Sequence, residues 1–228
     1  SSGQIDVKYM TAKEEDILTS SNLIEKGLVI DRLLESVIAD SKVKLDDLLI
    51  GDKNALMVGT RVLGYGKDYV VTMEDPDTSL EVEHSFDLTK LNHSTIDYEK
   101  LKGGKNEFQY TTTNSKTKFT FKLLTHKDER DIENELKAYK KLTDVTGVSN
   151  ELTTRLKKQI LSVDGEKDRQ KISEFVDNRF LALDTKEFRK YVVSIMPDIN
   201  FEQEYESQIG ELHTVTIPIG VRFFWPES

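Results

Sequence analysis

The chain has 228 residues and a net charge of −9, and charged residues make up 32% and hydrophobic residues 37% of its composition. No apolar run reaches the roughly 18 residues that cross a bilayer, and the lysines are interleaved with acids, which excludes a membrane span and argues against nucleic acid as a partner. The absence of cysteine excludes disulfides and thiolate metal ligands, and solubility alone accounts for the negative charge.

The first part of the chain predicts one strand followed by helices. Residues 4–9 alternate apolar and polar side chains, which is typical of a strand. Thr11 and Glu14 have the spacing of a capping box, which satisfies backbone N–H groups at a helix start. Asp52 is expected to cap a later helix, and the sequence GYG at 64–66 is expected to end it. The predicted helices cover residues 12–18, from 22 or 27 to 40, and 52–63.

Two β-hairpins are predicted, far apart in the sequence. In residues 68–88, two alternating runs flank DPDTS at 75–79, and in residues 199–219 two such runs flank ESQIG at 206–210. Asp, Pro, Ser and Gly favour turns, so each pentapeptide is expected at the tip of its hairpin. A further pair of strands, EFQYTTT and KFTFKLL, is rich in aromatic residues and threonine and surrounds NSKT at 114–117.

Residues 126–196 are predicted to be helical, because apolar side chains recur there at helical spacing. The second of four segments includes Ile160 and Val163 on its apolar face, and the fourth opens with Asp184 and Glu187 at the spacing of a capping box. The four segments cover residues 126–142, 148–163, 168–183 and 184–196.

This order of elements predicts the α+β fold class, with N-terminal helices, a small antiparallel sheet, a helical middle and a C-terminal hairpin. We expect helices and β-hairpins in residues 1–125, a helical region in 126–197, and a hairpin with an aromatic tail in 198–228. The hairpins at 68–88 and 199–219 are expected to form one module.

No arrangement typical of an enzyme is found in the sequence, so we expect no catalytic function. None of the histidines pairs with another at a spacing of four residues, and a zinc site needs about three or four convergent ligands. A surface or helix-start position is the simpler interpretation for His84, His93, His126 and His213. The glycine- and lysine-containing segments lack phosphate-loop spacing, and the acidic clusters lack calcium-loop spacing. We therefore expect no metal and no cofactor.

Two short segments are candidate contacts with a protein partner. The three aromatic residues of FFWP cannot all face one core, and aromatic side chains are common interface anchors. The alternative is that this tail covers the chain's own core. The acids of KEEDIL form the other candidate, for which a solvated, capped helix start is the alternative. The candidate residues are Glu14, Glu15, Asp16, Arg222, Phe223, Phe224 and Trp225.

Three segments carry a resemblance to a known family. YMTAKEEDILTSSNLIEKGLVIDRLL at 9–34 and DDLLIGDKNALMVGTRVLGYG at 46–66 resemble the baseplate hub proteins of T-even-like, contractile-tailed bacteriophages. VTIPIGVRFFWP at 215–226 is similar to the C-terminal end of that family. The resemblance covers the N-terminal part of the chain well and the C-terminal end moderately.

The resemblance implies a structural or assembly protein of a phage tail. It would be a component of the baseplate hub that binds other tail proteins, with self-association as a second kind of contact, and it would have no enzymatic activity. The alternative is a transient tail-assembly chaperone that is absent from the mature virion. The implied location is the host cytoplasm during assembly and the tail baseplate afterwards.

Members of this family often carry a C-P-x-C-G knuckle in each hairpin. Pro76 and Gly210 match that pattern, but the cysteines are replaced at Asp75, Thr78, Glu206 and Ile209. Two such knuckles that share one zinc ion must meet in space. We expect the hairpins to meet here without metal, held by strand pairing and by apolar contacts among Val82, Phe86, Val215 and Ile217.

Overall fold

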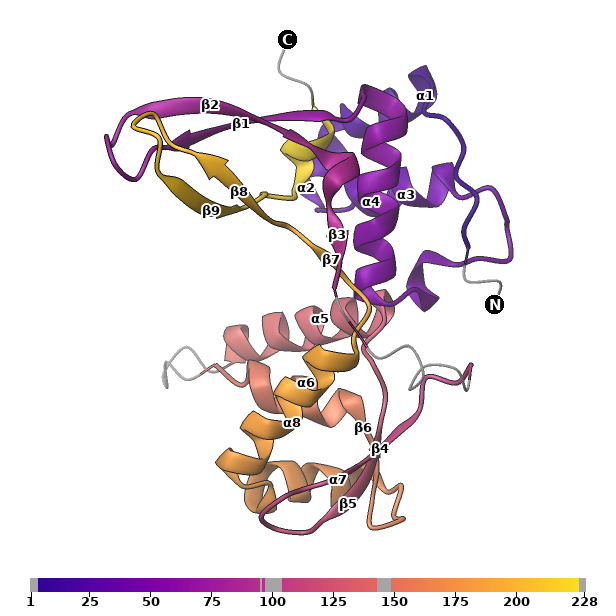
Figure 1. Ribbon diagram of the computed structural model, residues 1–228. Coiled ribbons are helices and arrows are strands. Elements are labelled where there is room, and N and C mark those ends of the chain that lie inside the picture. The colour runs from indigo at the N-terminus through magenta and orange to yellow at the C-terminus, as the bar shows by residue number, and fades with distance from the viewer. Residues whose placement is uncertain (1–3, 95, 97–103, 143–148, 226–228) are drawn as a thin grey trace. The chain divides into compact units, whose positions relative to one another are not determined.

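The computed structural model describes residues 4–94, 96, 104–142 and 149–225, and the chain divides into two compact units (Figure 1). Helices combine with small antiparallel sheets, which confirms the α+β class. The predicted boundary at 197 coincides with the end of the second unit, whereas the predicted boundary at 125 falls inside that unit, because the strands just before residue 125 pack with the helical middle. Unit 1 comprises Ser1–Leu45, Gly51–Ser94 and Asp198–Ser228, and unit 2 comprises Asp46–Ile50 and Thr95–Pro197.

Short helices form the N-terminal part of unit 1. The predicted capping box is confirmed, since the backbone N–H of Thr11 donates to Glu14 Oε2 at 2.9 Å. The helix predicted to end at residue 40 is two helices, because Gly27 has a φ of +67° and ends the first of them. The last helix begins before Asp52, which lies in its first turn. The helices are α1 (Ala12–Leu18), α2 (Ser21–Glu25), α3 (Val29–Val37) and α4 (Ile50–Tyr65), with 3₁₀ turns at Leu45–Asp47 and Leu88–Lys90.

Both predicted hairpins form, and both belong to unit 1. Along each strand, side chains alternate between an inner, more buried face and an outer, exposed face. In β1, for example, Tyr69 and Val71 are buried whereas Val70 between them is exposed. A pairing that the sequence did not predict joins β3 to β7. The strands are β1 (Asp68–Glu74), β2 (Glu81–Asp87), β3 (Asn92–His93), β7 (Ile199–Asn200), β8 (Glu202–Glu206) and β9 (Leu212–Thr216).

The aromatic tail packs on the core of unit 1. Phe223 and Phe224 are 1% and 0% exposed, within the 3₁₀ helix Val221–Phe224. The Phe223 ring meets the Tyr69 ring edge-on, with centroids 5.0 Å apart. Arg61 on α4 is also buried and donates from Nε to the Phe223 carbonyl at 2.9 Å. The two phenylalanines therefore cover the chain's own core, and in this fold a partner has no access to them.

A three-stranded antiparallel sheet and several helices make up unit 2. Residues 160–163, predicted as the end of a helix, are instead a strand at the edge of this sheet. Ile160 and Val163 are buried in either conformation, but as a strand they also pair with β5, where the Thr120 and Ser162 hydroxyls lie 2.6 Å apart. The elements are β4 (Phe108–Thr111), β5 (Lys118–Phe121), α5 (His126–Leu142), α6 (Glu151–Gln159), β6 (Ile160–Val163), α7 (Arg169–Glu174), a π-helical turn (Phe175–Arg179) and α8 (Ala182–Ile195).

Asp184 does not cap α8, as its spacing had predicted, but joins that helix to the β4–β5 turn. It lies in the first turn of α8 and is fully buried. Its carboxylate accepts hydrogen bonds from the backbone N–H and side-chain amide of Asn114, both at 2.8 Å, and from the backbone N–H of Ser115 at 3.0 Å. Burial alone would raise the pKa of Asp184, but these donors outweigh it and lower the pKa to about 2.

We expect Asp184→Asn to lower the free energy of unfolding of unit 2 by about 2 kcal/mol at neutral pH, because an amide NH₂ replaces an acceptor that now faces buried donors. The native pKa lies below the unfolded value, so this stabilisation is complete above about pH 4 and is lost as the pH falls toward about 2. Thermal unfolding between pH 7 and pH 2 would test this. The gap between wild type and variant should shrink at acid pH, and the exposed Glu174→Gln should show no such gap.

Candidate functional site

The tips of the two hairpins of unit 1 are joined by hydrogen bonds. Asp75, at the end of β1, is 0% exposed. Its Oδ1 accepts from the backbone N–H groups of Asp77 at 3.0 Å and Thr78 at 2.9 Å, which fixes its own turn. Its Oδ2 accepts from the backbone N–H of Gln208 at 3.1 Å, in the turn of the other hairpin. One carboxylate thus shapes one turn and binds the other.

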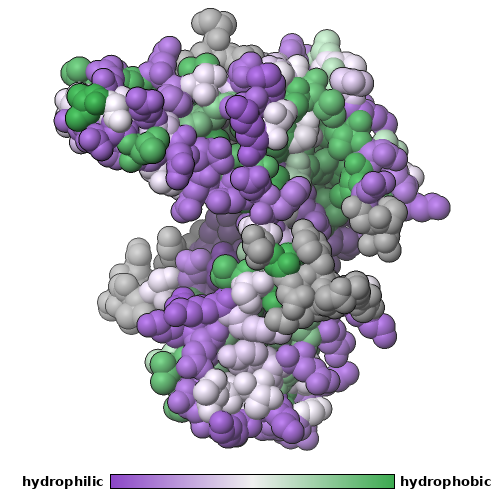
Figure 2. Space-filling view, viewed as in Figure 1, coloured by the Kyte–Doolittle hydropathy of each residue, from purple (hydrophilic) through white to green (hydrophobic). Residues whose placement is uncertain are grey.

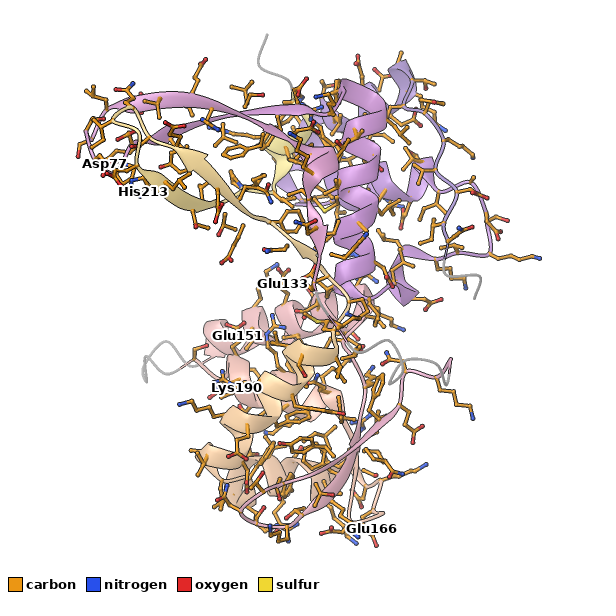
Figure 3. The ribbon with its side chains drawn as sticks, in the orientation of Figure 1. Asp77, Glu133, Glu151, Glu166, Lys190 and His213 are labelled. Carbon is orange, nitrogen blue, oxygen red and sulfur yellow. The ribbon has the colours of Figure 1, made fainter. Side chains whose placement is uncertain are left out.

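A second link lies beside the first. The Asp77 carboxylate is 2.8 Å from His213 Nε2, and Figure 3 shows the two side chains facing each other at the free end of the hairpins. Hydrogen bonds from the Ser207 hydroxyl and from His213 lower the pKa of Asp77. The pKa of Asp75 is lowered too, chiefly by the Gln208 N–H group. Both acids are therefore held in the charged form that accepts these bonds. We call Asp75, Asp77, Ser207, Gln208 and His213 the hairpin clasp.

Aromatic side chains continue the contact away from the clasp. The His84 ring lies between Phe86, at 4.8 Å between centroids, and Tyr205, at 5.3 Å. Tyr205 is buried, and burial, with the nearby charge of Asp75 second, raises its pKa. Of the apolar residues expected between the hairpins, Phe86 and Ile217 are buried and Val82 and Val215 are half-buried. The inner faces of the two hairpins thus pack together, and the expectation that they meet agrees with these contacts.

The predicted knuckle positions are only partly brought together. Asp75 and Thr78 lie at the clasp, but Glu206 is exposed and Ile209 is 64% exposed. In the second hairpin the buried polar residue at the tip is Ser207. It lies one position beyond Glu206, the predicted knuckle residue. Within the ranges that the structure describes, no group of three or more His, Asp or Glu side chains is placed to hold a metal ion.

The predicted partner contacts divide into buried and accessible residues. Glu14 is 6% exposed because its side chain is used in the capping box of α1, and Phe223 and Phe224 are buried as described above. Glu15, Asp16 and Arg222 are exposed and Trp225 is half-buried. Of the seven predicted contact residues, these four are accessible to a partner.

Sequence reasoning missed the second link of the clasp. The sequence favours a surface position for His213 and a turn position for Asp77, and neither interpretation includes their pairing. The available signal was that both lie in or next to the two predicted tips. Deciding which turn residues face inward required the strand register, which a single sequence does not contain.

The fold and the clasp together define a two-unit α+β protein whose two distant hairpins form one hydrogen-bonded module. Every helix among the described residues falls short of the length and apolar content that spanning a bilayer requires. The chain belongs to the T4 bacteriophage base plate protein family, whose model matches residues 1–225. A comparison with curated proteins and one with solved structures gave no match. Family membership makes the chain a structural protein of a phage baseplate that interacts with other tail proteins, and it favours a non-enzymatic role.

Proposed function

We propose that the chain is a component of the baseplate hub of a contractile phage tail and acts by binding other tail proteins. The observation that carries the proposal is that segments resembling hub proteins contact each other in the fold. Arg61, in the segment 46–66, binds the carbonyl of Phe223, in the segment 215–226. Residues 9–34 lie in the same unit as residues 51–66, whereas residues 46–50 belong to unit 2. Most of the resemblance therefore falls on one folded unit, and it adds to the family match over residues 1–225.

Quantitative mass spectrometry of purified virions tests the proposal. A hub component should be present at a fixed low copy number, and particles from a nonsense mutant should lack complete baseplates. If the chain is absent from mature particles although the same mutant fails to assemble tails, it is a transient assembly chaperone, and the hub proposal is wrong.

The accessible residues at the two predicted contact segments remain proposed contacts. Arg222 is exposed and Trp225 is half-buried next to the buried tail, and Glu15 and Asp16 are exposed on α1. We expect Trp225→Ala to weaken binding to a purified tail protein at least fivefold, as for a partly buried aromatic anchor. Unchanged binding by a variant with an unchanged melting temperature would remove the tail from the contact surface.

We also propose that the hairpin clasp holds the two tips together as a shared zinc ion would in relatives with paired cysteine knuckles. The hydrogen bonds of Asp75 and Asp77 to the second tip support this. Elemental analysis of the purified protein is expected to find no stoichiometric zinc. One zinc ion per chain would contradict the proposal.

A further inference from the structure

The two hairpins carry the negative charge of the whole chain. Residues 68–88 contain seven Asp and Glu and residues 199–219 contain four, and neither segment contains a lysine or arginine. The net charge of the chain is only −9, so all other residues together are slightly positive. The negative charge is therefore a local property of the hairpins, and a general need for solubility does not explain its position.

The register of the strands places most of these acids on the outer faces. Glu202, Glu204 and Glu206 alternate along β8, all exposed, at intervals of about 7 Å. Their cross-strand neighbours on β9 are Thr216, Thr214 and Leu212, which are exposed and uncharged. Among the described residues, none of the three glutamate side chains has a hydrogen-bond or ion-pair partner. The outer face of the second hairpin is thus a row of free carboxylates.

The first hairpin is neutralised at its base but not at its tip. At the base, Asp68 faces Asp87, and Lys67 binds both at 3.0 Å. At the tip, Glu74 faces Glu81, with no cation bound to either within the described part of the chain. Like charges directly opposite each other destabilise a strand pair. Repulsion between Glu74 and Glu81 therefore lowers the stability of the first hairpin at its tip.

Exposed apolar side chains lie among these acids. Leu80 is 57%, Ile209 64% and Leu212 73% exposed, and each lies at or next to a hairpin turn. Figure 2 shows green, apolar atoms among purple, hydrophilic ones at the end of the hairpins. Apolar side chains within a rim of charges are typical of protein-binding surfaces. Neither the apolar nor the acidic residues of this surface serve the inner packing of the hairpins.

We propose that the outer face of β8–β9, together with the apolar residues at the tips, binds a basic surface of another tail protein. The carboxylates would pair with lysine or arginine, and the apolar side chains of Ile209 and Leu212 would be buried at the centre. Charge selects this occupant: a second copy of the same face, a nucleic acid and an anionic lipid surface would all be repelled. The inference rests on the proposed function, which supplies the class of partner.

The test measures binding of the purified full chain to each purified tail protein of the same phage. Biolayer interferometry gives the association and dissociation rates at increasing salt concentrations. Wild type should bind one of them with an affinity that falls as salt rises. The triple variant Glu202→Gln, Glu204→Gln, Glu206→Gln should bind about tenfold more weakly, mainly through slower association. Ile209→Ser with Leu212→Ser should instead speed dissociation.

The matched control removes the same number of charges elsewhere. Glu107, Glu135 and Glu174 of unit 2 are exposed, and no partner of theirs is found among the described residues. Their triple replacement by glutamine should change binding less than twofold. Binding that is insensitive to salt and to the β8 triple variant would overturn the inference, and so would the absence of binding to every tail protein. Loss of wild-type binding on adding a chelator would show a bridging divalent cation instead of a basic partner.

These outcomes are independent of the test for the hub. If virions lack the chain but a basic tail protein still binds the β8 face, the hub proposal fails and this inference stands. If virions contain the chain and the β8 triple variant is incorporated as well as wild type, the hub proposal stands and this inference fails.

Discussion

Replacing Arg61 by methionine is expected to lower the free energy of unfolding of unit 1 by about 3 kcal/mol. Arg61 is 4% exposed and donates to three backbone carbonyls: Nε to Phe223 at 2.9 Å, Nη1 to Gly66 at 3.0 Å and Nη2 to Asp68 at 3.3 Å. Burial lowers its pKa, yet it stays charged at neutral pH. Methionine fills similar space but leaves the three acceptors without their donor.

The three carbonyls come from the end of α4, the start of β1 and the C-terminal tail. Among the described residues, the backbone hydrogen bonds donated by the tail are local, from Phe223 to Gly220 and from Trp225 to Arg222, so release of the tail should accompany the loss of stability. Trypsin cuts after arginine, and Arg222 is exposed while Phe223 next to it is buried. Faster cleavage after Arg222 in the Arg61→Met variant, with denaturant unfolding alongside, would therefore report both effects.

Arg32→Met is the matched control, because Arg32 is on the surface of α3 and, within the described part of the chain, pairs only with the exposed Glu35. It should change stability by less than about 1 kcal/mol and leave cleavage after Arg222 unchanged. Arg61→Lys should be intermediate, since an ammonium group cannot reach all the acceptors that the guanidinium fork binds. Equal stability of wild type and Arg61→Met would show that the packing of Phe223 and Phe224 holds the tail without this residue.

Local patterns predicted most of the local elements, but the strand expected over residues 4–9 does not form, and the described structure has only an isolated bridge there, between Val7 and Ile38. The capping box of Thr11 and Glu14, both hairpins and the helix over 126–142 all form, because capping, alternation and helical period depend on neighbours in the sequence. The meeting of the two hairpins also agrees with the expectation, but that expectation depended on the resemblance to a family. Composition or periodicity alone would not have joined residues so far apart.

Long-range pairing decided the elements that were missed. Ile160 and Val163 fit an apolar helix face as well as a strand, and the edge of β5 decided between them. The short pairing of β3 with β7 involves two residues on each side, too few to give a pattern. Arg61 looks like an ordinary surface residue of a helix, since nothing nearby in sequence marks the carbonyls it binds. Each of these outcomes depends on a partner that single-sequence patterns do not identify.

Replacing Asp75 by asparagine is expected to lower the melting temperature of unit 1 by about 10 °C and to separate the hairpin tips. The Asp75 carboxylate uses one oxygen for its own turn and the other for the Gln208 N–H group. Asparagine has the same shape but only one acceptor, so its NH₂ group must face a backbone donor on one side or the other. Hydrogen exchange would show this as a loss of protection at the Gln208 amide.

Glu74→Gln is the matched control, because it separates the loss of a negative charge from the loss of the Asp75 hydrogen bonds. It removes the same charge from the adjacent residue, which is exposed and whose side chain has no partner within the described residues. Because Glu74 faces Glu81, its neutralisation should leave the Gln208 amide protected and raise stability slightly, by a few tenths of a kcal/mol. Opposite effects of Asp75→Asn and Glu74→Gln on stability would show that Asp75 joins the two hairpins, whereas Glu74 destabilises the first hairpin. If both variants lose protection equally, overall charge governs the contact, and Asp75 has no special place in the clasp.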